Sequence, residues 1–280
     1  MKIAIASGKG GTGKTTISAN LAARAIKNNA SVHYADFDVE EPNGRIFLRP
    51  DIRESLPVNV MIPQVDQDTC IACGKCEEIC QYGAIVVIGE QALVYPELCH
   101  SCGGCRLVCP VDAITEIPRQ VGKIEKGDAS SGIQFLEGDL NIGEQMATPV
   151  IRQLKKMIPE DGLVFMDAPP GTSCPVIETV NGADYTILVT EPTPFGLNDL
   201  ELAVGMMREL SQPFGVVINR AGMGNDDVRD YLNREKIDIL AEIPNDSRVA
   251  EAYSRGELAV NVFPETAQSY STILKSIGAE

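Results

Sequence analysis

The sequence lacks both a long apolar run and an excess of basic residues. No apolar stretch among its 280 residues reaches the roughly 18–20 residues that a membrane-spanning helix needs. The chain passes from Met1 and Lys2 directly into a strand-like segment without signal-peptide features, so we expect a cytoplasmic protein with no membrane partner. Lysine and arginine number 24 against 39 aspartates and glutamates, which gives a net charge of −15. Because nucleic acids are bound mainly through cationic contacts to phosphate, this balance also predicts no nucleic-acid partner.

Cysteine is concentrated in one part of the chain. Eight of the nine cysteines lie between Cys70 and Cys109. A disulfide framework is not expected in a cytoplasmic protein, because that compartment keeps thiols reduced. We therefore interpret the cysteine-rich segment as a metal-binding one.

Outside this segment the sequence alternates between strand-like and helix-like stretches. The expected strands are 2–6, 31–37, 163–167, 185–190, 214–219 and 237–243. The expected helices are 14–28, 149–157, 197–210, 226–234, one beginning at 247, and 268–276. Such alternation is typical of a doubly wound α/β fold, in which helices cover both faces of a mostly parallel sheet. We predict one discontinuous domain made of residues 1–61 and 119–280, with residues 62–118 as a small inserted domain.

The cysteine-rich segment contains an internal repeat. Residues 70–85 (CIACGKCEEICQYGAI) and 99–114 (CHSCGGCRLVCPVDAI) match at a constant offset of 29 positions. Two copies of so short a unit usually pack about a pseudo-twofold axis, since neither can bury its apolar face alone.

The first strand is followed by a phosphate-binding signature. Residues 8–15 read GKGGTGKT and match G-x-x-x-x-G-K-T between a predicted strand and a predicted helix. Converging backbone N–H groups and the helix N-terminus would bind phosphate, Lys14 would reach the β- and γ-phosphates, and the Thr15 hydroxyl would ligate Mg²⁺. A glycine-rich turn without a ligand is the alternative. The nucleotide contacts predicted in this loop are Gly8, Lys9, Gly10, Gly11, Thr12, Gly13, Lys14, Thr15 and Thr16.

With its second lysine, Lys9, the loop resembles the deviant Walker A motif of the MinD, ParA, Mrp and nitrogenase iron-protein group of ATPases. The resemblance continues at Asn20, at residues 36–38 (DFD), at 167–171 (DAPPG) and at Asn219 with Arg220. These motifs cover the chain outside the insert.

The resemblance implies an ATPase that forms a nucleotide-dependent homodimer, in which Lys9 contacts the nucleotide of the other subunit. Asp38 would help to orient the attacking water, and Asp167 would hold Mg²⁺ through its hydration shell. Asn219 would contact the adenine of ATP or ADP. The alternatives are a solvated loop lysine for Lys9 and a purely structural acid for Asp36.

The spacing C-x2-C-x2-C-x3-C occurs twice and is typical of bacterial ferredoxins with two [4Fe–4S] clusters. In that arrangement the fourth cysteine of each run ligates the other cluster. We predict that Cys70, Cys73, Cys76 and Cys109 hold one cluster, and that Cys80, Cys99, Cys102 and Cys105 hold the second. Gln81 departs from the pattern, because a proline usually follows the fourth cysteine. Tetrahedral zinc on the same thiols is the alternative.

Four further residues lie near these motifs. His100 is expected to be a solvated loop residue rather than a ligand, and Tyr82 and Tyr95 are expected to shield the clusters as core. Cys174 stands where the nitrogenase iron protein places a bridging ligand, but that bridge needs a second cysteine. A buried or interface thiol is therefore the favoured interpretation.

Together these features predict an ATPase that couples its nucleotide state to electron transfer toward a redox partner protein. The alternative is an ATP-dependent carrier that delivers clusters to apo-protein acceptors. Mrp-type relatives bind their transferable cluster through a C-terminal C-x-x-C, which this sequence lacks. A MinD-like positioning ATPase is less favoured, because no basic amphipathic helix stands near the C-terminus.

Overall fold

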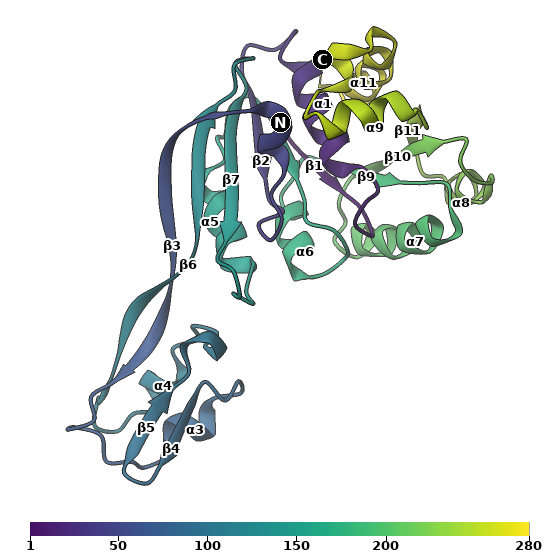
Figure 1. Cartoon of the computed structure of the whole chain (residues 1–280). Coiled ribbons are helices and arrows are strands. Elements are labelled where there is room, and N and C mark those ends of the chain that lie inside the picture. Colours follow the sequence, from purple (N-terminus) through teal and green to yellow (C-terminus); the bar gives the residue numbers. More distant parts are fainter. Residues whose placement is uncertain (280) are drawn as a thin grey trace.

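The computed structural model describes residues 1–279 and is built on a nine-stranded sheet of order β11-β10-β9-β1-β8-β2-β7-β6-β3 (Figure 1). Seven neighbouring strands, from β11 to β7, run parallel, which confirms the expected doubly wound α/β fold. Their bounds are β1 Lys2–Ala6, β2 Val32–Asp36, β7 Gln134–Leu140, β8 Leu163–Asp167, β9 Tyr185–Thr190, β10 Phe214–Ala221 and β11 Ile239–Pro244.

Helices cover both faces of this sheet. One face packs against α5 (Thr148–Met157), α6 (Cys174–Val180), α7 (Pro194–Glu209) and α8 (Asp227–Glu235). The other packs against α1 (Lys14–Ala25), α2 (Gly44–Leu48), α10 (Ala259–Val262) and α11 (Pro264–Ser276), with α9 (Ser247–Ser254) beside them. Within residues 1–279, no helix is long and apolar enough to cross a bilayer.

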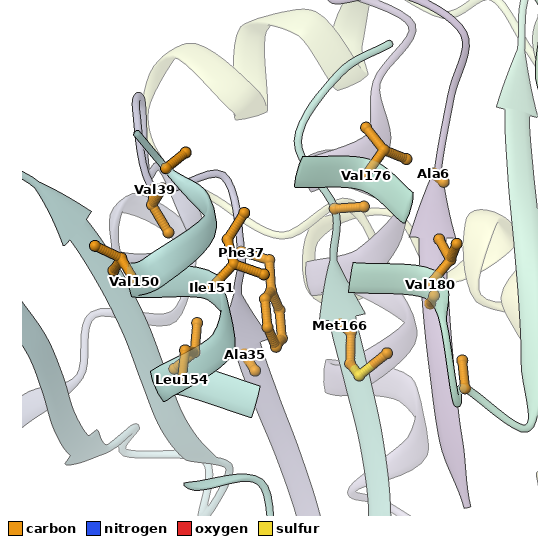
Figure 2. Packing of buried hydrophobic residues seen from close by; sticks show 14 of the residues in the cluster. Ala6, Ala35, Phe37, Val39, Val150, Ile151, Leu154, Met166, Val176 and Val180 are labelled. Atoms are coloured by element: carbon orange, nitrogen blue, oxygen red, sulfur yellow. The ribbon is translucent and has the colours of Figure 1, made fainter. Parts of the chain in front are cut away.

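The packing of α5 and α6 illustrates why these segments are helical. Val150, Ile151 and Leu154 recur at helical spacing along α5 and meet the sheet beside Ala35, while α6 packs nearby over the strand that carries Met166 (Figure 2). Because these α5 side chains are fully buried, their removal from water stabilises the helix on the sheet. The expected helix 149–157 is confirmed, whereas α6 and β7 were not predicted.

Two 15-residue antiparallel strands extend the sheet into an arm. β3 (Asp51–Val65) pairs with β6 (Ile114–Asp128) along its length, but β6 pairs with β7 only from Gly122 to Asp128. Beyond that point the two strands leave the body and carry a small lobe, residues 66–113 (Figure 1). Neither β3 nor β6 was predicted. Pro57 and Pro63 are tolerated in β3, because β3 is the edge strand of the sheet.

The lobe is built from two similar halves. It contains α3 (Lys75–Ile79), β4 (Ile85–Ile88), β5 (Gln91–Val94), a 3₁₀ turn at Pro96–Leu98 and α4 (Gly104–Leu107). The β4–β5 pair Ile85↔Val94 has its counterpart, 29 positions away, in the β6–β3 pair Ile114↔Val65. Left-handed residues recur at the same offset, at 72 and 101, 74 and 103, and 83 and 112. The repeat in the sequence is therefore a repeat in backbone conformation.

Candidate nucleotide cleft and cysteine lobe

The phosphate-binding loop connects β1 to α1. Its geometry requires glycine: Gly13 has φ +94°, and a Cβ there would lie 2.4 Å from Nδ2 of Asn219. A Cβ on Gly8 would lie 2.0 Å from the carbonyl oxygen of Asp199. The Asn219 amide donates to the carbonyl oxygen of Thr12 at 2.8 Å, which ties the end of β10 to the loop. The first N–H groups of α1 are free to bind an anion beside the buried Lys14.

A cleft of about 410 Å³ opens beside this loop. Its lining includes these residues predicted for nucleotide or catalysis: Gly10, Gly11, Gly13, Lys14, Thr15, Thr16, Asp38 and Asn219. Gly8, Lys9, Thr12 and Asp167 do not line it. Part of the wall comes from residues 243–270, including Tyr253 and Tyr270, for which the sequence carried no recognisable signal.

Asp167, at the end of β8, is fully buried next to the loop. Its Oδ2 accepts a hydrogen bond from the Tyr34 hydroxyl at 2.8 Å, whereas its Oδ1 has no partner within residues 1–279. Burial raises the pKa of Asp167, while nearby Lys14 and Thr15 act in the opposite direction. An oxygen without a partner, beside a lysine and a threonine hydroxyl, is suited to a hydrated cation.

The two acids after β2 have different environments. Asp38 lines the cleft, and burial raises its pKa to about 6 against the opposing charge of Lys14. Asp36 accepts backbone N–H groups from Asp38 at 3.1 Å, Asn43 at 3.1 Å and Gly44 at 2.8 Å. Asp36 therefore has a structural role in holding the segment 38–44.

Lys9 is turned toward its own chain. Its Nζ lies 2.6 Å from Oε1 of Glu191, and Glu191 also pairs with Arg220 at 2.9 Å. The loop lysine is thus ion-paired rather than solvated. Sequence reasoning did not single out Glu191, which follows β9 and carries no motif.

The eight clustered cysteines surround two separate small cavities in the lobe. Cys70, Cys73, Cys76 and Cys109 line one, and Cys80, Cys99, Cys102 and Cys105 line the other. The structure thus brings together the two quartets expected from the spacing, each with its fourth cysteine from the other run.

Backbone amides approach the fourth thiol of each run in the same way. The N–H of Ala84 donates to Sγ of Cys80, and the N–H of Ala113 donates to Sγ of Cys109, both at 3.3 Å. Burial raises the pKa of the Cys76, Cys99 and Cys105 thiols. Within the described 279 residues, no three or more His, Cys, Asp or Glu side chains converge on one ion position.

The expectation that the two tyrosines beside the cysteines belong to the core was wrong. Tyr82 and Tyr95 are 46% and 43% exposed and are not core; Tyr82 instead stacks on His100, with ring centroids 3.6 Å apart. His100 is exposed, as expected for a loop residue. Cys174 is exposed at the start of α6, because the helix directs its apolar face to the sheet from Val176 onward. It is therefore not a buried thiol, and its place in an interface stays a prediction.

A P-loop between the first strand and first helix of a doubly wound sheet, with carboxylates after β2 and β8, defines a P-loop nucleotide-binding protein. The model of the CobQ/CobB/MinD/ParA nucleotide binding domain matches residues 3–260, and the chain belongs to this family.

Similar proteins are found in Methanocaldococcus jannaschii and Pyrococcus horikoshii. One uncharacterized protein of Methanocaldococcus jannaschii is 36% identical to this chain, and the match covers 80% of each protein. A second uncharacterized protein of the same organism is 30% identical, and the match covers 92% of this chain and 90% of that protein. An iron-sulfur cluster carrier protein of Pyrococcus horikoshii is 26% identical over 99% of this chain and 87% of its own.

Among solved structures, the septum site-determining protein MinD of Pyrococcus horikoshii, complexed with Mg-ADP, has a TM-score of 0.60 at 20% identity, covering 98% of this chain and 94% of that one. A plasmid partition protein of Borrelia burgdorferi bound to AMPPNP has a TM-score of 0.57 at 14% identity, covering 98% and 96%. These likenesses show the fold alone.

Proposed function

We propose that this chain is an ATP-dependent iron–sulfur protein, in which nucleotide bound at the P-loop controls two [4Fe–4S] clusters held by the lobe. The observation that carries the proposal is the pair of cysteine quartets at the end of an arm whose first strand begins just after the nucleotide site. Residues 1–61 and 119–280 would form the ATPase domain, and residues 62–118 an inserted ferredoxin domain. The arm strands β3 and β6 would then belong partly to each.

The cleft fits MgATP. Lys14 and the loop amides would bind the phosphates, and Thr15 together with Asp167 would hold Mg²⁺, which neutralises charge on the phosphates. Asp38, which lines the cleft, would orient a water, and Asn219, which is hydrogen-bonded to the loop, would contact the base. In a homodimer, Lys9 would leave Glu191 and contact the nucleotide bound by the second subunit.

The lobe fits cubane clusters better than single zinc ions. Zinc needs four sulfurs at about 2.3 Å from one point. Here the thiols of each quartet instead surround a cavity with mainly apolar walls, including Val65, Val87 and Ile114 in the first. Amide N–H groups directed at Cys80 and Cys109 would stabilise cluster sulfur charge.

The names of the relatives favour cluster delivery as the outcome of the ATP cycle. Proteins called iron-sulfur cluster carrier from three Pyrococcus species match this chain at 24–26% identity over at least 91% of its length. We therefore place transfer of clusters to apo-protein acceptors first. Electron transfer to a redox partner protein is the second candidate. Each quartet combines three cysteines of one run with the fourth cysteine of the other run, and such shared ligation favours clusters that the protein retains over clusters that it releases.

A short structural route would connect the nucleotide to the lobe. Asp36 holds the segment 38–44 through backbone N–H groups, and that segment leads into α2 and then β3. On α2, Arg45 is paired with both Glu125 of β6 and Glu137 of β7, at the base of the arm. A change at Asp38 on nucleotide binding would therefore reach the arm through α2. A coupling of about 1–3 kcal/mol between two sites is typical.

The test begins with anaerobic reconstitution of the protein, followed by mixing with apo-ferredoxin in the presence of MgATP, MgADP or no nucleotide. Iron appearing in the acceptor only with MgATP supports delivery. A shift of the cluster potential with MgATP and no loss of iron supports electron transfer; about 59 mV corresponds to a tenfold change for one electron.

Lys14→Ala is the control, since it should abolish the nucleotide effect and leave the iron content unchanged. Clusters that respond to neither nucleotide in the wild-type protein would refute both candidates.

A further inference from the structure

Tyr34 is a fully buried tyrosine on β2 that the phosphate-binding motifs do not include. Its ring stacks on Phe135 with centroids 5.9 Å apart. Its hydroxyl donates to Oδ2 of Asp167 at 2.8 Å and lies 3.3 Å from Oγ of Ser18 on α1. A buried hydroxyl therefore stands between the loop helix and the carboxylate at the end of β8.

The protonation state of each group decides which one donates in these hydrogen bonds. A tyrosine hydroxyl carries its proton at neutral pH, and that of Tyr34 is buried away from water. An ionised carboxylate only accepts, so the Tyr34 proton goes to Asp167. The Ser18 hydroxyl in turn donates to the carbonyl oxygen of Thr15 at 3.1 Å.

The ring has little freedom to move away from this position. A Cβ on Gly44, the first residue of α2, would lie 2.4 Å from Cε1 and 2.7 Å from the hydroxyl oxygen of Tyr34. Gly44 is itself held by its N–H donated to Asp36 at 2.8 Å. The ring is therefore enclosed between Phe135 and the segment that follows β2.

We propose that Tyr34 is a positioning residue for the Mg²⁺ of the bound nucleotide, because its hydroxyl occupies Oδ2 of Asp167 and leaves Oδ1 for the hydrated metal. Oδ1 is buried and has no hydrogen-bond partner in the described chain. Without the tyrosine donor, both carboxylate oxygens would lack a fixed partner and the carboxylate could rotate or take up a proton. This inference rests on the proposed binding of MgATP.

The test compares Tyr34→Phe with Tyr231→Phe, which removes the hydroxyl of another buried tyrosine, on α8 away from the cleft. Binding of a fluorescent ATP analogue is titrated against Mg²⁺ and is also measured in EDTA. Loss of a hydrogen bond to a charged group corresponds to about a tenfold change. We expect Tyr34→Phe to need about tenfold more Mg²⁺ for half-maximal binding. Its affinity in EDTA should be unchanged, and Tyr231→Phe should match the wild-type protein in both.

An unchanged Mg²⁺ requirement in Tyr34→Phe overturns the inference, as does an equal loss of affinity with and without metal, which would indicate a purely structural role. Ser18→Ala provides a second test should Tyr34→Phe not fold. It removes the competing hydroxyl and keeps the Tyr34 donor, so the Mg²⁺ requirement should not rise; a rise would overturn the inference. Equal affinity of the wild-type protein for nucleotide with and without Mg²⁺ would overturn the proposed binding of MgATP at this site, whereas the Tyr34 results alone leave that proposal standing.

Discussion

Replacing cysteines two at a time tests which thiols share a cluster. Cys73 and Cys109 belong to different runs but line the same cavity, whereas Cys73 and Cys80 belong to one run but line different cavities. With one four-iron cluster in each cavity, the reconstituted wild-type protein should hold about eight irons per chain. Both double variants lose two thiols, so each is the matched control of the other.

The structure predicts different iron contents for the two variants. Cys73→Ala with Cys109→Ala takes both ligands from one quartet and should leave about four irons, in the cluster held by Cys80 and its partners. Cys73→Ala with Cys80→Ala takes one ligand from each quartet and should lower the content below about four, because both clusters are left with three thiolates. Two clusters held separately by the two runs would give the reverse order.

The assay is iron and sulfide content after anaerobic reconstitution and desalting, with electron paramagnetic resonance of the reduced protein to count cluster types. MgATP binding serves as the folding control, because β1 and α1, which flank the phosphate-binding loop, lie in the body at the other end of the arm from the lobe (Figure 1). The crossed assignment is refuted if the Cys73/Cys80 variant retains one intact cluster while the Cys73/Cys109 variant loses both.

Three further predictions concern the nucleotide-binding body. Burial raises the pKa of Asp38 to about 6, so kcat/KM for ATP should fall as the pH drops through about 6 and its carboxylate protonates; a flat profile would contradict the assigned role. Because ionisation of Asp38 costs folding stability above that pH, Asp38→Asn should also raise the melting temperature at neutral pH. Leu154→Ala on α5, where the side chain is fully buried, should cost about 2–5 kcal/mol in urea unfolding. Leu202→Ala, at a 58% exposed position, is its control, and equal losses in the two variants would disprove the packing argument.

Local signals predicted the parts of the site that are built from contiguous residues. The glycines and Lys14 of the phosphate-binding loop act within one turn between β1 and α1, and their spacing alone predicted their convergence on the cleft. The strands Lys2–Ala6, Leu163–Asp167 and Tyr185–Thr190 were predicted to the residue, because buried parallel strands read as short apolar runs.

Long-range contacts were not predictable in this way. The cleft wall formed by Tyr253 and Tyr270 and the hydrogen bond from Tyr34 to Asp167 join segments that are far apart in the sequence. The ion pair between Lys9 and Glu191 spans 182 positions. The sequence around one residue of such a pair contains no pattern that identifies its partner.

The sequence by itself determined the P-loop, the doubly wound α/β body and the repeat of two cysteine runs, because each depends on spacing within a single turn, helix or strand. Only the tertiary structure decided that β3 and β6 form a long arm and that α2 joins the nucleotide segment to the base of that arm through Arg45. It also decided that one oxygen of Asp167 has no hydrogen-bond partner among residues 1–279. These features arise when the chain folds back on itself. They depend on which groups that are distant in the sequence pack against one another and become buried, and only the folded chain determines this.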